Sequence, residues 1–159
     1  MKYKELFDKW GLASLRVNLN FIEMEFVPTP DDKEAAWEMY VEMITRIVTQ
    51  PLESEHGDEK TALSSIFSLF PSTREILRSR GRKAQGFTKI AVIVLNQIVR
   101  PFTAKWHKLS LEGAFDDPKW CREFRSELEE LQAALRRYAA LLADLAEVED
   151  ITDLETVSL

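Results

Sequence analysis

Residues 87–111, FTKIAVIVLNQIVRPFTAKWHKLSL, decide the fold of this chain. Residues 90–95 are apolar on every side, and a helix of that composition belongs in the interior of a protein. Pro101 lacks the N–H that would bond the carbonyl four residues earlier, so the helix should bend there. The stretch therefore predicts a long central helix with a kink near Pro101.

Three further helices are expected to pack around this centre. Residues 31–50 carry apolar side chains at helical spacing after an aspartate cap. Residues 58–80 continue the helical pattern, and Pro71 either kinks this helix or opens a new one. Residues 118–148 begin at an Asp-Pro pair, which is a strong start signal. The predicted fold is mainly α: a bundle of four or five helices around a central buried helix.

The last of these helices carries a sustained heptad seam. Its apolar residues recur at alternating steps of three and four: Cys121, Phe124, Leu128, Leu131, Leu135, Tyr138, Leu142 and Leu145. Such a seam either lies along the core of a bundle or pairs with a helix of another subunit. The sequence leaves both arrangements open.

The N-terminal region has the opposite periodicity. Apolar and polar side chains alternate in residues 15–26, and the phase slips by one residue after Phe21. This period predicts one extended, β-like segment. No partner strand is evident, so the segment either crosses the helices as a strap or pairs with a second copy. Residues 1–148 should form a single helical domain, followed by an acidic C-terminal tail over residues 149–159.

Size and composition are those of a one-domain globular protein of 159 residues. The lone cysteine, Cys121, excludes an internal disulfide and a cysteine-based metal cluster. Two distant histidines, His56 and His107, do not form a zinc site, so neither a metal nor a cofactor is predicted. The N-terminus lacks a signal-peptide core. The longest uncharged apolar run is about half of a membrane span. We expect a cytoplasmic protein that does not enter a membrane.

The charge is unevenly distributed along the chain. Residues 72–111 hold nine Lys or Arg and a single glutamate, a net charge of +8, whereas residues 1–71 carry −6 and residues 112–159 carry −8. Either the acidic helices neutralise the basic segment within the fold, or a basic face serves an anionic partner. The acidic overall balance of −6 favours the first interpretation.

One polar stripe on the central helix is a candidate binding site. Asn96, Arg100 and His107 follow at steps of four and seven, with Lys89 and Thr103 on the same face. Arginine offers a fork of donors, and Asn and His add further donors, so the stripe is suited to phosphate or carboxylate. Alternatively the stripe faces water, or Arg100 forms an ion pair with Glu38 or Glu42 of the preceding acidic ridge.

Two other functional hypotheses are weaker. Arg74, Arg78, Arg80, Arg82 and Lys83 form a basic run that could contact nucleic acid, but no recognition motif accompanies them, so ordinary basic surface is favoured. His107 could act as a general base, which requires a nucleophile and an orienting carboxylate that the sequence does not reveal. The chain is therefore predicted to be a non-enzyme rather than an enzyme.

Three segments together carry a resemblance. They are AAWEMYVEMITRIVTQPL at residues 35–52, GDEKTAL and SLFPSTREIL within residues 57–77, and LNQIVRPFTAKWH at residues 95–107. They resemble a family of small, uncharacterised bacterial helical proteins with an LNxxxRPFxxKWH motif. The resemblance implies a link to bacterial defence against phage and mobile DNA, and no catalytic residues. It also draws attention to Lys105 and Arg46.

The sequence thus predicts a non-enzymatic interaction or regulatory subunit, in a bacterial antiphage defence system, with a protein partner or self-association. The alternative is a binding module for an anionic ligand, a nucleotide or nucleic acid, through the basic stripe of the central helix. The candidate ligand-binding residues are Asn96, Arg100, Lys105 and His107. The candidate ion-pair residues are Glu38, Glu42 and Arg46.

Overall fold

The computed structural model describes residues 1–155, and all regular secondary structure among them is helical. The prediction of a mainly α chain is confirmed. The α-helices are α1 (Tyr3–Lys9), α2 (Leu19–Ile22), α3 (Pro30–Ile44), α4 (Glu59–Phe67), α5 (Leu69–Arg80), α6 (Gln85–Val94), α7 (Arg100–Leu111) and α8 (Pro118–Ala146). Short 3-10 turns occupy Gly81–Lys83, Ala114–Asp116 and Thr152–Glu155.

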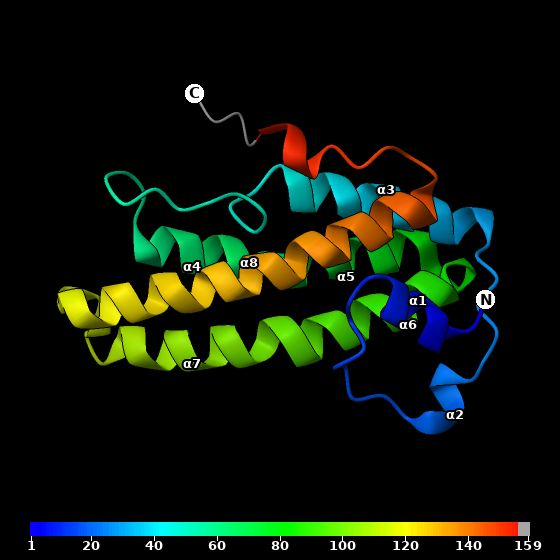
Figure 1. Cartoon of the computed structure of the whole chain (residues 1–159), viewed down its shortest axis with the longest axis horizontal. Helices are drawn as coiled ribbons and strands as arrows, with labels where there is room; N and C mark the ends of the chain where they lie inside the picture. Colours follow the sequence, from blue (N-terminus) through cyan, green and yellow to red (C-terminus); the bar gives the residue numbers. More distant parts are fainter. Residues whose placement is uncertain (156–159) are drawn as a thin grey trace.

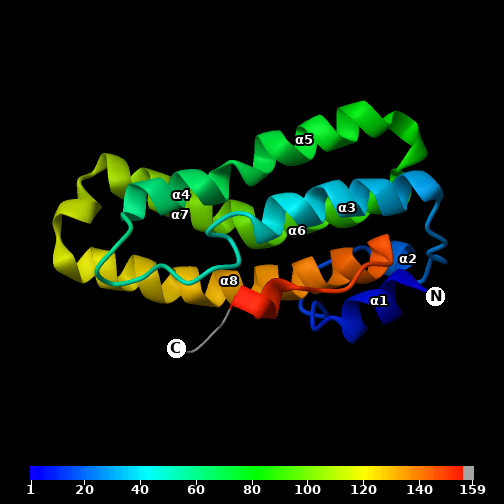
Figure 2. The same cartoon turned by 90° about the horizontal axis from the view of Figure 1, so that it is seen from above.

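The helices pack lengthwise into an elongated molecule. Helix α8 runs along most of its length, and α6 and α7 follow end to end beside it (Figure 1). Helix α3 packs against α8, α5 and α6, while α4 packs against α7 and α8. Seen from above, α4 and α5 follow one another along the edge opposite α8 (Figure 2). The core is therefore shared by α3, α5, α6 and α8 in one half and by α4, α7 and α8 in the other.

The central stretch is buried as expected, but it does not contain a simple kink. A π-helical turn, Leu95–Val99, connects α6 to α7. The Arg100 N–H bonds to the Leu95 carbonyl, five residues earlier, and Pro101 falls in the first turn of α7, where its missing donor costs little. The extra residue of the π turn thus accommodates Pro101.

The heptad seam of α8 lies in the core of a single chain. Phe124, Leu128, Leu135, Tyr138 and Leu142 are almost completely buried, and the main helix that covers α8 is α3. Among the seam residues only Cys121 is partly exposed. Of the two arrangements that the sequence left open, the structure has the internal one. The seam is therefore not an association surface.

The N-terminal segment differs from its predicted extended form. Leu19–Ile22 form one helical turn, which the Asn18 side chain caps by accepting a hydrogen bond from the Asn20 N–H at 2.8 Å. Within residues 1–155 the only β pairing is an isolated bridge between Lys2 and Glu25. Without a partner strand, the backbone of residues 18–24 forms mostly local hydrogen bonds, and the Gln97 side chain binds both the N–H and the carbonyl of Arg16. The apolar side chains pack on α1 instead; the Phe21 and Tyr3 ring centres are 4.3 Å apart.

The first part of the predicted acidic tail is bound to the domain. The Tyr40 hydroxyl donates to the Asp150 carboxylate at 2.9 Å and accepts from the Ile151 N–H at 2.7 Å. Thr152 is buried and donates twice to Asp150. The packed domain therefore extends past residue 148 to the turn Thr152–Glu155, and the remainder of the predicted tail, residues 156–159, lies outside the described residues.

The helix predicted over residues 31–50 begins one residue early and ends six residues early, at Ile44. Its cap is Thr29 rather than an aspartate. Three polar side chains of α8 then hold the following loop by its carbonyl groups. Gln132 donates to the carbonyls of residues 47 and 50, Arg136 to that of residue 49, and Arg125 to those of residues 52 and 53. These tertiary bonds replace the helical ones.

The three tyrosines predict how the fold responds to alkaline pH. Burial, aided by the Asp32 charge, raises the pKa of Tyr3 to about 12, and burial also raises the pKa values of Tyr40 and Tyr138. Each tyrosine stays neutral in the folded chain but ionises near pH 10 once unfolded. Their contribution is complete below pH 10 and is lost as the pH rises from there to the pKa of each folded tyrosine, by at most about 1.4 kcal/mol per pH unit for each one.

We therefore expect tyrosine ionisation, followed by absorbance at 295 nm, to coincide with loss of helical circular dichroism above pH 10. Tyrosines that ionise near pH 10 while the helical signal is unchanged would contradict this burial.

Candidate functional site

The polar stripe of the central helix is partly assembled in the structure. The Arg100 Nε donates to the Asn96 Oδ1 at 2.9 Å, and the Arg100 guanidinium lies 4.6 Å from the centre of the Phe70 ring. Asn96 and Arg100 are both exposed. No carboxylate within residues 1–155 forms an ion pair with Arg100, so the terminal nitrogens of its guanidinium are available to an anion.

The other predicted members of the stripe lie in different surroundings. His107 packs edge-on against Phe67, with ring centres 5.1 Å apart. Lys105 forms ion pairs with Glu127 and Glu123, the latter at 3.2 Å. The hydrogen bond to Glu127 is the largest of the effects that raise the pKa of Lys105. Lys105 therefore joins α7 to α8, and it is not part of a free anion site.

The two remaining positions of the stripe are also occupied by internal contacts. The Thr103 hydroxyl donates to the Val99 and Arg100 carbonyls in its own helix. The Lys89 ammonium lies 6.0 Å from the ring centres of Tyr3 and Phe21. Only Asn96, Arg100 and His107 thus remain as an accessible row.

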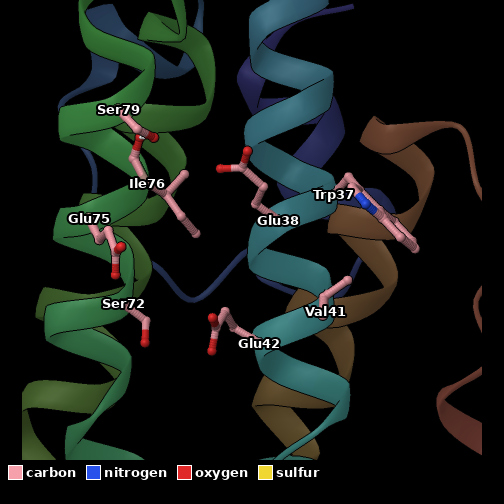
Figure 3. A pocket seen from close by; sticks show the side chains of 8 residues that line it. All are labelled: Trp37, Glu38, Val41, Glu42, Ser72, Glu75, Ile76 and Ser79. Carbon is pink, nitrogen blue, oxygen red and sulfur yellow. Dashed lines mark hydrogen bonds between the residues drawn. The ribbon is translucent and has the colours of Figure 1, made fainter.

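The expected ion pairs between Arg100 and the acidic ridge of α3 are not formed. Glu38 instead pairs with Arg80, and Glu42 pairs with Arg46 at 2.5 Å. Arg46 also donates to the Ser72 hydroxyl at 3.0 Å. Glu38 and Glu42 point toward α5, which packs against α3 (Figure 3), whereas Arg100 of α7 contacts the Phe70 ring of α5. The acidic ridge therefore joins α3 to α5.

Between α3 and α5 lies an open groove of about 480 Å³. Its lining residues are Trp37, Glu38, Val41, Glu42, Ser72, Glu75, Ile76 and Ser79. Figure 3 shows Glu38 and Glu42 reaching from α3 into the gap, with the side chains of the α5 residues facing them. An arginine lies near each end of the groove. Arg80 binds Glu38 at one end, and Arg46 binds Glu42 at the other.

The exposure of two side chains of the groove is not explained by polar contacts within the fold. Trp37 is 44% exposed, although a tryptophan is normally buried. Glu75 is exposed and pairs with no cation among residues 1–155. An exposed aromatic ring beside carboxylates provides apolar contact together with directional acceptors. This combination is suited to binding another molecule.

The basic segment is only partly neutralised within the fold. Of the nine Lys and Arg in residues 72–111, only Arg80 and Lys105 form ion pairs with carboxylates in the described part of the chain. Arg74 and Arg78 are exposed on the outer side of α5. The interpretation that the acidic helices offset the basic segment thus holds for two positions. Elsewhere the basic surface is open to a partner.

Sequence reasoning identified Glu38, Glu42 and Arg46 but missed the groove that they border. It also missed Trp37, Glu75 and the two serines. A signal was present for Trp37, because this residue lies on the polar side of an amphipathic helix, between Glu34 and Glu38. Glu75 and the serines gave no signal, since their role depends on the packing of α5 against α3.

Comparison of the chain with protein-family models, curated proteins and solved structures finds no match. Among residues 1–155, no group of three or more His, Cys, Asp or Glu side chains is arranged to hold a metal ion. In the same residues, no helix is both long and apolar enough to span a membrane.

Proposed function

We propose that this chain is a non-enzymatic interaction subunit that binds another protein chain through one surface, the α3–α5 face. This face consists of Glu34, Trp37, Glu38, Val41 and Glu42 of α3 with Ser72, Arg74, Glu75, Arg78 and Ser79 of α5. The observation that carries the proposal is the exposed Trp37 ring beside an open groove with charged walls. Tryptophan is among the residues that contribute most to protein interfaces.

The internal position of the heptad seam supports the same proposal. Because α8 uses its seam within the chain, association requires another surface. The α3–α5 face offers two apolar side chains, Trp37 and Val41, on the side of α3 away from α5, beside the carboxylates that reach into the groove (Figure 3). Apolar side chains next to charged ones are typical of protein interfaces.

A photo-crosslinking amino acid at Ser79, inside the groove, tests the proposal in living cells. We expect a crosslinked protein from this position and none from the same amino acid at Leu111, which is 90% exposed and lies outside the face. Adding Trp37→Ala should remove the crosslink without changing the melting temperature by more than a few degrees, because the ring is half exposed. Crosslinks that are identical at both positions, or insensitive to Trp37→Ala, would contradict an interface on this face.

A second candidate function is a binding module for an anionic ligand at Asn96, Arg100 and His107. The observation that favours it is the Arg100 guanidinium, fixed by Asn96 and by the Phe70 ring and free of carboxylates within residues 1–155. In this case labelled nucleotide or single-stranded nucleic acid should bind less tightly as salt increases. Arg100→Ala should weaken binding at least about tenfold, since a charge-assisted contact is worth about 1.5–3 kcal/mol. Binding unaffected by salt and by Arg100→Ala would exclude this site.

The cellular setting is a further part of the proposal. The resemblance of the LNQIVRPFTAKWH segment supports the assignment of the subunit to a bacterial antiphage defence system in the cytoplasm. This assignment is based on the motif and on no contact in the fold. Deletion of the gene should then lower the resistance of its host to phage. If the Trp37→Ala variant restored this resistance, the defence role would not depend on the α3–α5 face.

A further inference from the structure

We propose that the partner of the α3–α5 face is the same face of a second copy of this chain, related by a two-fold axis through the groove. This inference rests on the proposed interaction function, and it specifies the partner. It follows from the charges of the face, from the direction of its two helices and from the position of its apolar side chains.

The two helices of the face carry opposite charges on their outer sides. Helix α3 presents an acidic ridge at four-residue spacing, Glu34, Glu38 and Glu42, and the side chain of Glu34 is 63% exposed. Helix α5 presents Arg74 and Arg78, one turn apart, with no carboxylate bound to either among residues 1–155. An acidic ridge and a basic ridge thus run side by side on one surface.

The helices of the face are antiparallel. Arg46 beyond the end of α3 contacts Ser72 at the start of α5, and Glu38 contacts Arg80 at the end of α5. A two-fold axis that lies in the plane of the face and runs along the groove, parallel to the helices, exchanges the two ridges. It places α3 of each copy over α5 of the other. An acidic ridge therefore faces a basic ridge at two places in the same interface. An interface of this isologous kind is complete with two copies and leaves no free end for further growth.

The apolar side chains lie at one edge of the face and in the groove. Trp37 and Val41 are on the side of α3 away from α5, and Ile76 lines the groove from α5 (Figure 3). Two-fold pairing would cover each Trp37 ring with α5 of the other copy, while the charged ridges beside the rings set register and specificity. Helices α3 and α5, of 15 and 12 residues, are about 22 and 18 Å long. Such a face is near the lower limit of specific interfaces, about 1,200 Å² in total, so the dimer should be weak and reversible.

Other occupants fit the charges less well. A nucleic acid attracted by Arg74 and Arg78 would also meet the carboxylates of Glu38 and Glu75. A basic helix drawn to the acidic ridge would be repelled by the arginines of α5. A second copy presents both signs in the complementary order, and like-charge contacts are avoided.

Charge reversal of each ridge tests the symmetry directly. One variant, Glu34→Lys/Glu42→Lys, makes the α3 ridge basic; the other, Arg74→Glu/Arg78→Glu, makes the α5 ridge acidic. The second changes only exposed residues without ion pairs among residues 1–155. The first removes two partly exposed ion pairs, that of Glu42 with Arg46 and that of Glu34 with Arg80 at 3.9 Å, each worth a few tenths of a kcal/mol. Sedimentation equilibrium over a range of concentrations measures dimerisation, and circular dichroism confirms that each variant is folded.

We expect each variant alone to dimerise at least about tenfold more weakly than the original chain, because both contacts of its dimer become like-charge contacts. An equal mixture of the two should dimerise as the original chain does, since both contacts again join opposite charges. The quadruple variant, with both ridges reversed, should also dimerise with itself but not with the original chain. Matched reversals outside the face, Glu129→Lys/Glu130→Lys and Lys60→Glu/Lys108→Glu, should have no effect.

The inference is overturned if the original chain is a monomer at every concentration, if either variant dimerises normally, or if mixing does not restore the dimer. A monomer whose Ser79 crosslinks, through Trp37, to a different protein would overturn the two-fold dimer and leave the interaction function intact. Absence of both a dimer and any Trp37-dependent crosslink would remove the interaction function as well.

Discussion

Replacement of Leu135 by glutamate is expected to leave the chain without a stable fold. Leu135 is fully buried in the seam of α8, in the core that α3 and α8 share. The substitution removes a buried leucine side chain, a loss of about 2–5 kcal/mol. It also places a carboxylate in an apolar environment, which adds several kcal/mol. The sum is comparable to the whole stability of a domain, about 5–15 kcal/mol.

Far-ultraviolet circular dichroism and thermal melting provide the measurement. The matched control is Leu111→Glu, the same chemical change at a leucine that is 90% exposed, and it should melt within a few degrees of the original chain. A folded Leu135→Glu variant that had lost only an oligomer would show that the seam pairs between subunits, contrary to its position in the core.

The second large effect is expected from Asp32→Ala. Asp32 is 2% exposed, and its carboxylate joins the starts of two helices. One oxygen accepts from the Thr29 N–H at 2.9 Å, in the cap of α3. The other accepts from the Phe87 N–H at 2.8 Å, in the first turn of α6. Both helix dipoles also favour this negative charge.

Removal of the carboxylate leaves the buried Phe87 N–H and the partly buried Thr29 N–H without an acceptor, so we expect a loss of about 2–4 kcal/mol in the free energy of unfolding. Urea denaturation measures this loss in the free energy of unfolding. Asp31→Ala, at the neighbouring position, removes a first-turn charge that forms no hydrogen bond within residues 1–155, and it should cost no more than about 1 kcal/mol. Equal losses from the two substitutions would mean that the Asp32 bonds do not stabilise the junction.

Gly86 shows how closely this junction is packed. A Cβ atom at residue 86 would lie 2.8 Å from the Phe26 ring and 3.0 Å from the Asp32 carboxylate. The start of α6 therefore approaches α3 more closely than any other residue type would permit. The sequence places a glycine there, but it does not reveal which surfaces meet.

The features that the sequence determined by itself depend on residues that are close together in the chain. Asp58 and the pair Asp117-Pro118 begin α4 and α8 as predicted, because a cap bonds to N–H groups two or three residues away. The apolar stretch of residues 90–95 identified the central helix, since a segment that is apolar on every side must be covered. The spacing of the α8 seam predicted which of its residues would be buried.

What only the tertiary structure decided depends on residues far apart in the sequence. Residues 15–26 alternate like a strand, yet without a partner strand they turn and pack on α1. Arg100 binds the face of Phe70 rather than Glu38, because α5 holds the acidic ridge of α3. The groove exists because α5 packs beside α3 in the opposite direction. Periodicity and caps are local properties, whereas the partners of a charged side chain are fixed only when the helices are assembled.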